Sequence, residues 1–140
     1  MEDRNDHSPV IVVADDGEAF HYIIKSVLKN IGVICNLVSV NDGLELMEFL
    51  CHRGSIAHTV TPDLVILDLE MPRKDGRTAL REIKSAPILR SIPVVVMSSS
   101  FSNDDVQLCL EFGCQYFIKP IDYDQWVEKI RGVVKEFLKV

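Results

Sequence analysis

The chain lacks any apolar stretch near the roughly 20 residues that a membrane span requires. Basic residues are also few: 15 Lys and Arg stand against 21 Asp and Glu, so the net charge is −6. This balance disfavours nucleic-acid binding, which needs clustered cations to contact a phosphate backbone. The first residues, MEDRNDHSP, lack the basic end and apolar stretch of a secretory signal. We therefore expect a cytoplasmic protein with neither a membrane nor a nucleic acid as its partner.

Other absences limit the architecture. None of the four cysteines belongs to a CxxC pair, and no histidine stands at metal-ligand spacing from them, so we interpret them as reduced thiols that pack like small apolar residues. No linker, repeat or low-complexity stretch is present, and 140 residues suit one domain. We expect a single domain over residues 1–140, with a core from about residue 9 to 138 and a polar tail over residues 1–8.

Short apolar runs alternate with segments of helical period, which indicates repeated βα units. The runs predict strands at residues 10–14, 34–38, 64–67, 93–97 and 116–118. Apolar stripes predict a helix after each strand: one ending near Gly32, one through residues 44–51, one at 76–85, one from about Asn103 capped by Ser102, and one carrying Trp126. Because the chain is too short for a barrel, we predict an α/β, flavodoxin-like, doubly wound sheet of five parallel strands in the order 2-1-3-4-5.

Charged residues follow the predicted strands directly. The run PVIVVADD ends in Asp15 and Asp16, LVILD ends in Asp68, and YFIKP carries Lys119. Buried parallel strands are apolar on both faces, so a charge at the last position marks the rim where ligands bind. In the predicted order, the first and third strands are neighbours at the topological switch point. We therefore expect the three aspartates to cluster, with Ser98 and Lys119 approaching from the fourth and fifth strands.

An acidic cluster of this kind predicts a magnesium site. Mg²⁺ prefers oxygen ligands and usually takes one or two carboxylates together with waters and phosphate oxygens. We expect Asp16 and Asp68 to bind the ion directly and Asp15 to hold a coordinated water. The backbone carbonyl of Glu70 would complete the protein's share of the octahedron.

The same residues suit phosphoryl transfer. A carboxylate of Asp68 can attack a phosphorus atom, Lys119 can neutralise developing charge, and Ser98 can donate a hydrogen bond to a phosphoryl oxygen. Each residue alone also has a plain structural explanation as a helix cap, a turn residue or a solvated lysine. Their shared placement at strand ends favours the functional interpretation.

These residues resemble the receiver domain of bacterial two-component response regulators, the CheY-like family, over nearly the whole chain. That family has an acidic pair after the first strand, an acceptor aspartate after the third, Thr or Ser after the fourth, and Lys-Pro after the fifth. An aromatic switch residue lies three positions before that lysine, and MPRKDG after Asp68 is likewise typical of receivers. The matching positions here are Asp15, Asp16, Asp68, Ser98, Tyr116, Lys119 and Pro120.

The resemblance implies a phosphorylation switch. A sensor histidine kinase would transfer a phosphoryl group to Asp68 in an Mg²⁺-dependent reaction. Ser98 would then move toward the phosphoryl group and Tyr116 would turn inward. The resemblance also implies a cis peptide bond between Lys119 and Pro120. Such a protein is not an enzyme, although it assists its own phosphorylation and dephosphorylation.

A narrower resemblance suggests the pathway. The long loop before the third predicted strand and the run MPRKDGRTALREIKSAPILRSIPVVV are similar to single-domain receivers paired with phytochrome-type histidine kinases. This implies a homodimer through the face of the fourth helix, fifth strand and fifth helix, with Phe101, Tyr116 and Trp126 as interface candidates. For Trp126, plain core packing is the preferred interpretation. With no output domain after the last helix, we expect the output to be contact with another, unknown protein.

Three alternatives stay open on the sequence. A receiver-like interaction module could lack phosphorylation altogether. A phosphohydrolase of the haloacid dehalogenase type needs a second Asp two residues after the nucleophile, where this chain has Glu70. A flavodoxin-like binder needs a Gly, Ser or Thr-rich phosphate loop where this chain has ADDGEAF. We also expect Glu70 to affect the lifetime of the phosphoryl group.

Overall fold

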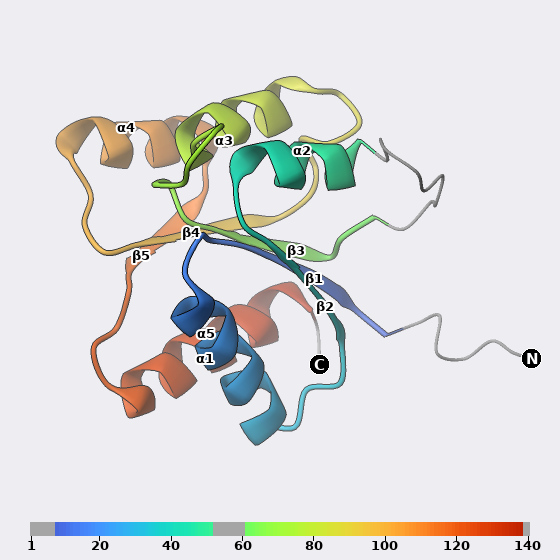
Figure 1. Cartoon of the computed structure of the whole chain (residues 1–140), viewed down its shortest axis with the longest axis vertical. Helices are drawn as coiled ribbons and strands as arrows, with labels where there is room; N and C mark the ends of the chain where they lie inside the picture. Colours follow the sequence, from blue (N-terminus) through green and yellow to red (C-terminus); the bar gives the residue numbers. More distant parts are fainter. Residues whose placement is uncertain (1–7, 52–60, 139–140) are drawn as a thin grey trace, which may run out of the picture.

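Five parallel strands form one sheet in the order β2-β1-β3-β4-β5, which confirms the predicted topology. The computed structural model describes residues 8–51 and 61–138 (Figure 1). The strands are β1 (Val10–Ala14), β2 (Asn36–Val40), β3 (Leu64–Leu67), β4 (Val94–Ser98) and β5 (Gln115–Ile118). The helices are α1 (Glu18–Asn30), α2 (Gly43–Leu50), α3 (Gly76–Ser85), α4 (Asn103–Phe112) and α5 (Tyr123–Phe137).

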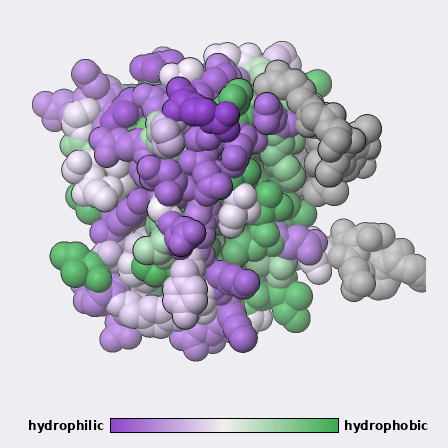
Figure 2. All heavy atoms as spheres, in the orientation of Figure 1, coloured by the Kyte–Doolittle hydropathy of each residue, from purple (hydrophilic) through white to green (hydrophobic). Residues whose placement is uncertain are grey.

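The helices cover both faces of the sheet, α1 and α5 on one and α2, α3 and α4 on the other (Figure 1). Because side chains alternate along a strand, β1 sends Ile11 and Val13 into the cluster with α1 and α5, and Val12 and Ala14 into the cluster with α2 and α3. Hydrophilic side chains cover the upper helices in Figure 2, and an apolar area lies to the right, at the end of the sheet where the strands begin.

Most predicted boundaries lie within two residues of the observed ones, and β2 differs most instructively. The apolar run predicts residues 34–38, whereas the strand covers Asn36–Val40 and Ile34 is exposed. β2 is an edge strand that pairs with β1 alone, from Val10 opposite Asn36 onward. Its position is therefore determined by the register with β1 and not by the apolar run. Most of the predicted tail over residues 1–8 and most of the long loop before β3 lie outside the described residues.

Side-chain caps fix where several helices begin. Asp42 and Asp75 accept hydrogen bonds from the third residue beyond each of them, at the starts of α2 and α3. Ser102 caps α4 as predicted, and the Asp105 carboxylate accepts a hydrogen bond from the Ser102 N–H, which completes a capping box. The loops at the carboxyl ends of the strands are thus anchored at their far ends.

Two remaining expectations concern composition. All four cysteines are free thiols, and Cys109 and Cys114 are buried among apolar side chains, whereas Cys51 is exposed. Within the parts of the chain that the structure describes, no helix combines the length and apolar character needed to cross a membrane.

Candidate functional site

The sheet register brings the acidic residues together. The Asp68 N–H donates to the Ala14 carbonyl at 3.0 Å, so the pairing of β1 with β3 continues one residue beyond the strands. Asp15 and Asp68 are therefore neighbours, both almost fully buried, while Asp16 is exposed at the rim. One carboxylate oxygen from each of the three aspartates lies within 4.8 Å of the others. The predicted convergence at the switch point is present.

Lys119 reaches this cluster from β5. Its N–H donates to the Ser98 carbonyl at 2.8 Å, which extends the pairing of β4 with β5. Its ammonium lies 2.7 Å from Asp15 Oδ2 and 3.4 Å from Asp68 Oδ2. The same ammonium lies 4.5 Å from the centre of the Phe20 ring, where the ring face attracts a cation. The lysine thus partly neutralises two buried carboxylates.

Burial and charge act in opposite directions on these groups. Burial raises the pKa of Asp68 to about 6; Lys119 opposes this rise and Asp15 adds to it. Burial by itself lowers the pKa of Lys119, but the hydrogen bond to Asp15 and the charge of Asp68 outweigh that effect and raise it. Near neutral pH, Asp68 is therefore mostly a carboxylate, the form that can act as a nucleophile or a metal ligand.

A glycine permits the tight turn after the acceptor position. The Gly76 N–H donates to the Leu69 carbonyl at 2.8 Å, and a Cβ on Gly76 would lie 2.1 Å from the Asp68 carbonyl oxygen. No side chain fits at that distance. The glycine of MPRKDG is thus required for the loop that follows Asp68 to pack against the start of α3.

The acidic cluster opens into a cleft of about 840 Å³. Both charged or polar side chains and apolar side chains line it. The polar and charged lining residues are Asp15, Asp16, Asp68, Glu70, Ser99 and Lys119, and the apolar ones include Phe20, Ile23, Ile118, Ile121 and Trp126. A cleft of this size, with charged groups in its lining, can admit a phosphorylated side chain of another protein.

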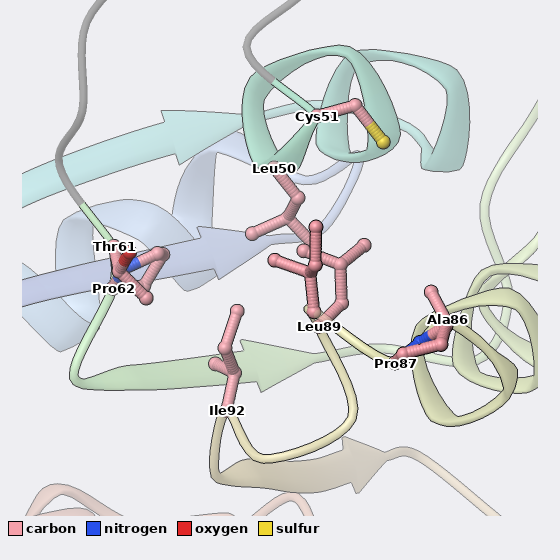
Figure 3. A pocket seen from close by; sticks show the side chains of 9 residues that line it. Leu50, Cys51, Thr61, Pro62, Ala86, Pro87, Leu89 and Ile92 are labelled. Atoms are coloured by element: carbon pink, nitrogen blue, oxygen red, sulfur yellow. The ribbon is translucent and has the colours of Figure 1, made fainter.

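A second cavity, of about 300 Å³, lies at the opposite end of the sheet and has a different character. Figure 3 shows Leu50, Leu89 and Ile92 around it, with Thr61 and Cys51 at its edge. Among its described lining residues there is no charged side chain. The phosphoryl chemistry that the sequence predicts therefore belongs to the acidic cleft.

The comparisons with known proteins agree with this geometry. Residues 11–131 match the model of the response regulator receiver domain. The chain belongs to the response regulator receiver family. It is 34% identical over 140 residues to the response regulator Rcp1 of Synechocystis, covering 99% of this chain and 95% of that protein.

Solved structures of similar receivers give the same assignment. The phosphorylated cyanobacterial phytochrome response regulator RcpA superposes with a TM-score of 0.86 at 36% identity, covering 94% of each chain. The Mn²⁺-bound form of response regulator Rcp1 superposes with a TM-score of 0.82 at 35% identity, covering 90% of this chain and 91% of that one. This receiver therefore functions in two-component phosphorelay signalling, and the phosphohydrolase and flavodoxin-like alternatives find no support.

The predicted switch hydroxyl of this receiver, on Ser98, is buried and is not part of the cleft lining. Ser98 is buried at the end of β4, and its Oγ has no hydrogen-bond partner among the described residues. Ser99, one position later, lines the cleft instead. Because a buried hydroxyl without a partner is unfavourable, a new acceptor within reach of Ser98 Oγ would lower the free energy of the protein.

The predicted aromatic residues have different environments. Tyr116 is half-buried, and its ring centre lies 5.2 Å from that of Phe101, in the loop between β4 and α4. Trp126 is buried, with its ring centre 5.5 Å from that of Phe20. Core packing, the preferred interpretation of Trp126, is therefore correct, and its role as an interface candidate is wrong.

The predicted cis bond before Pro120 is also wrong for this structure. The described residues contain no cis peptide bond, so Lys119 and Pro120 are joined in the trans form, which X-Pro bonds prefer by about 0.5–1 kcal/mol. Lys119 still contacts both buried carboxylates, so its side chain reaches the cluster without the cis geometry. Pro120 itself lines the cleft.

Two ion pairs near the cleft were not predicted from the sequence. The Arg73 Nε–H donates to Asp42 at 2.7 Å and ties the loop after Asp68 to the start of α2. Arg77 pairs with Asp105 and ties the start of α3 to the start of α4. The sequence signals the capping aspartates through their positions before or in the first turn of a helix, but it contains no signal for the arginine partners.

Proposed function

We propose that Asp68 is the phosphoacceptor of this receiver. The observation that carries the proposal is the convergence of Asp68 with Asp15, Asp16 and Lys119 in one cleft, since these groups lie on three different βα units. A receiver-like module that is never phosphorylated would not need a half-buried lysine contacting two buried carboxylates. The phosphorylated state of RcpA, a similar receiver, supports the same conclusion.

The transfer itself needs little covalent chemistry from the protein. A carboxylate oxygen of Asp68 donates an electron pair to phosphorus, the bond from phosphorus to the donor's histidine nitrogen breaks, and that nitrogen keeps the bonding pair. Lys119, 3.4 Å from Asp68 Oδ2, lies where it can neutralise charge that develops on the phosphoryl oxygens. Ser98 and Ser99 carry the hydroxyls that can donate to the product.

The aspartates fit a divalent cation. Three carboxylates offer hard oxygen ligands within 4.8 Å of one another, the donor type that Mg²⁺ and Mn²⁺ prefer. We propose that Asp16 and Asp68 bind Mg²⁺ directly, that Asp15 holds a coordinated water, and that the Glu70 carbonyl adds a ligand. The bound ion supplies charge neutralisation for phosphoryl transfer. The Mn²⁺-bound form of the similar Rcp1 supports this assignment.

Phosphorylation by a small-molecule donor tests both proposals. Incubation with acetyl phosphate and Mg²⁺ should give an intact-mass gain of about 80 Da, the mass of one phosphoryl group. The gain should vanish in the Asp68→Asn variant and in the parent treated with EDTA. An adduct that persists in Asp68→Asn would place the acceptor elsewhere, and one that forms equally in EDTA would exclude a role for the metal.

We further propose that the kinase partner is of the phytochrome type. The support is the likeness to RcpA and Rcp1, since RcpA is a cyanobacterial phytochrome response regulator and both cover nearly the whole chain. Phosphotransfer from a panel of purified kinases tests this, because a cognate kinase should phosphorylate the receiver much faster than the others. The single-domain bounds, the cytoplasmic location and the unknown downstream protein stay predictions.

A homodimer through the surface of α4, β5 and α5 is part of the same proposal. This surface carries the exposed apolar residues Leu110 and Ile118, and Phe101 packs against Tyr116 beside it. Single exposed apolar side chains are ordinary, but several on one surface favour association. Because Phe101 and Tyr116 connect this surface to the loop after Ser98, phosphorylation can change its shape.

Light scattering coupled to gel filtration tests the dimer. Leu110→Asp, in α4, should shift the phosphorylated protein toward the monomer. Ile88→Asp is the matched control, because Ile88 is exposed beside the apolar cavity at the other end of the molecule and should leave the dimer intact. Equal effects of the two variants, or a monomer in every state, would exclude this interface.

A further inference from the structure

Arg77 has no role in the phosphoacceptor proposal, yet its side chain makes several polar contacts close to the cleft. Its Nε–H and Nη2–H donate to the two carboxylate oxygens of Asp105, at 2.6 and 3.0 Å. This two-point geometry is the strong form of an arginine–carboxylate pair. Asp105 is only 2% exposed, so the pair is largely shielded from water on that side.

Asp105 in turn fixes the end of the loop between β4 and α4. Its Oδ2 accepts from the Ser102 N–H at 3.2 Å, and its own N–H donates to Ser102 Oγ at 3.1 Å. Ser98, Ser99 and Phe101 belong to the short segment that ends at this cap, and Phe101 contacts Tyr116. The carboxylate that Arg77 binds therefore anchors the segment that carries the proposed switch hydroxyl.

The other side of Arg77 faces the loop after Asp68. Its Nη1–H donates to the Leu69 carbonyl at 3.5 Å, and its Nη2 lies 3.8 Å from a Glu70 carboxylate oxygen. Leu69 and Glu70 directly follow the acceptor, and the Glu70 N–H donates to Asp68 Oδ1 at 3.3 Å. One guanidinium thus joins the backbone next to the acceptor to the cap of α4.

We propose that Arg77 is a positioning residue that, through its two-point contact with Asp105, holds the Ser98–Ser102 segment in the unphosphorylated arrangement and opposes the move of Ser98 toward a phosphoryl group. This inference rests on the proposed phosphorylation of Asp68. When Ser98 shifts, the segment must move while its far end is held at Ser102. Loss of the restraint lowers the free energy of the phosphorylated-like state relative to the unphosphorylated one, so a phosphoryl mimic should bind more tightly.

The test is a titration with beryllofluoride, an anion that mimics a phosphoryl group on a carboxylate, in the presence of Mg²⁺. Trp126 is the single tryptophan of the chain and lines the cleft, so its fluorescence reports binding. Arg77→Gln and Asp105→Asn should each bind the mimic about fivefold more tightly than the parent, a coupling at the low end of the usual range. The double variant should show no further gain, because both single changes remove the same contact.

Two further variants separate positioning from general stability. Lys74→Gln breaks the ion pair between Lys74 and Glu82, which does not reach α4. The Lys74 side chain is 26% exposed and that of Arg77 is 30% exposed, so the two pairs are comparable. We expect Lys74→Gln to leave the affinity for the mimic unchanged. Arg77→Lys keeps the charge but loses the two-point fork, so its affinity should lie between those of the parent and Arg77→Gln.

The possible outcomes are distinct. Arg77 variants that unfold more easily in urea yet bind beryllofluoride with parental affinity would show an ordinary structural ion pair and overturn the inference. Additive effects of Arg77→Gln and Asp105→Asn would overturn the route through Asp105. A parent protein that binds no beryllofluoride with Mg²⁺ would instead refute the proposed phosphorylation, and the inference with it.

Discussion

Replacing Asp68 by Asn should stabilise the metal-free protein near neutral pH. The substitution removes a buried carboxylate whose ionisation burial and Asp15 both oppose. Asparagine keeps an oxygen that can accept the hydrogen bond from the Glu70 N–H, now 3.3 Å from Asp68 Oδ1. Lys119 keeps its closer partner, Asp15, at 2.7 Å. The change therefore removes an unfavourable charge while most of the local contacts survive.

The size and pH dependence follow from the pKa of Asp68. That pKa rises from 3.8 to about 6 on folding. At about 1.36 kcal/mol per pKa unit, this rise changes the free energy of unfolding by at most about 3 kcal/mol. Water at the cleft mouth reduces the expected effect to about 1–2 kcal/mol. Because the folded pKa is the higher one, the folded state binds the proton more tightly. The resulting stability is fully present below pH 3.8 and is lost as the pH rises through about 6.

Urea unfolding in EDTA, followed by Trp126 fluorescence, measures the effect. The free energy of unfolding of Asp68→Asn should exceed that of the parent by about 1–2 kcal/mol at about pH 8 and by little at about pH 4. Asp16→Asn is the control: its side chain is exposed, so its metal-free stability should change by less than about 0.5 kcal/mol. Saturating Mg²⁺ should then stabilise the parent more than either variant, since both variants lose a ligand.

The decisive comparison is between the two pH values. An Asp68→Asn variant that is no more stable than the parent at about pH 8 would mean that the buried charge is fully compensated. An advantage that persists unchanged at about pH 4 would mean that the stabilisation does not come from removing ionisation. Either result would refute the conclusion that burial and Asp15 oppose the ionisation of Asp68.

Other substitutions test the loop after the acceptor, the switch hydroxyl and the rim of the cleft. Gly76→Ala should lower the free energy of unfolding by about 3 kcal/mol or more, because its Cβ would lie 2.1 Å from the Asp68 carbonyl oxygen. Gly132→Ala, in α5, should instead raise the free energy of unfolding by about 0.5–1 kcal/mol, because no atom lies within 4 Å of the added Cβ. Equal effects of the two variants in thermal unfolding would contradict the turn geometry. Ser98→Ala should leave stability unchanged or raise it by up to about 1 kcal/mol, since the Oγ has no described partner, but should lower the steady-state fraction phosphorylated by acetyl phosphate; a large loss of stability would reveal a missing partner. Glu70→Asn should change the rate at which the phosphorylated protein loses its phosphoryl group by several-fold, as followed by intact mass, because Glu70 adds a carboxylate to the cleft lining; identical rates would remove Glu70 from the mechanism.

The topology and the acidic cluster could be predicted from the sequence because their signals are local. An apolar run followed at once by a charge marks a strand that ends at the rim, and this applies at Asp15, Asp68 and Lys119 alike. Alternation of such runs with helical stripes leaves few topologies, and the switch-point rule then brings the strand ends together. The helix cap at Ser102 was predictable for the same reason, since a capping residue acts within one turn.

Pairings between side chains on different elements could not be predicted in this way. The acidic cluster was expected, but only the packed structure shows Lys119 closer to Asp15 than to Asp68, and Ser98 buried without a described hydrogen-bond partner while Ser99 lines the cleft. The trans bond before Pro120 corrects an expectation taken from a family resemblance, which does not fix a single peptide bond in this chain.

Sequence alone determined which residue types stand at the ends of the strands, because burial of both sheet faces excludes charge everywhere else along a strand. Tertiary structure alone decided which of those groups meet, and how, as the contact of Arg77 with Asp105 shows across 28 positions of chain. The physical reason is range: periodicity, capping and turn preference act over a few residues, whereas the direction of a side chain and the partner it finds depend on every element packed around it.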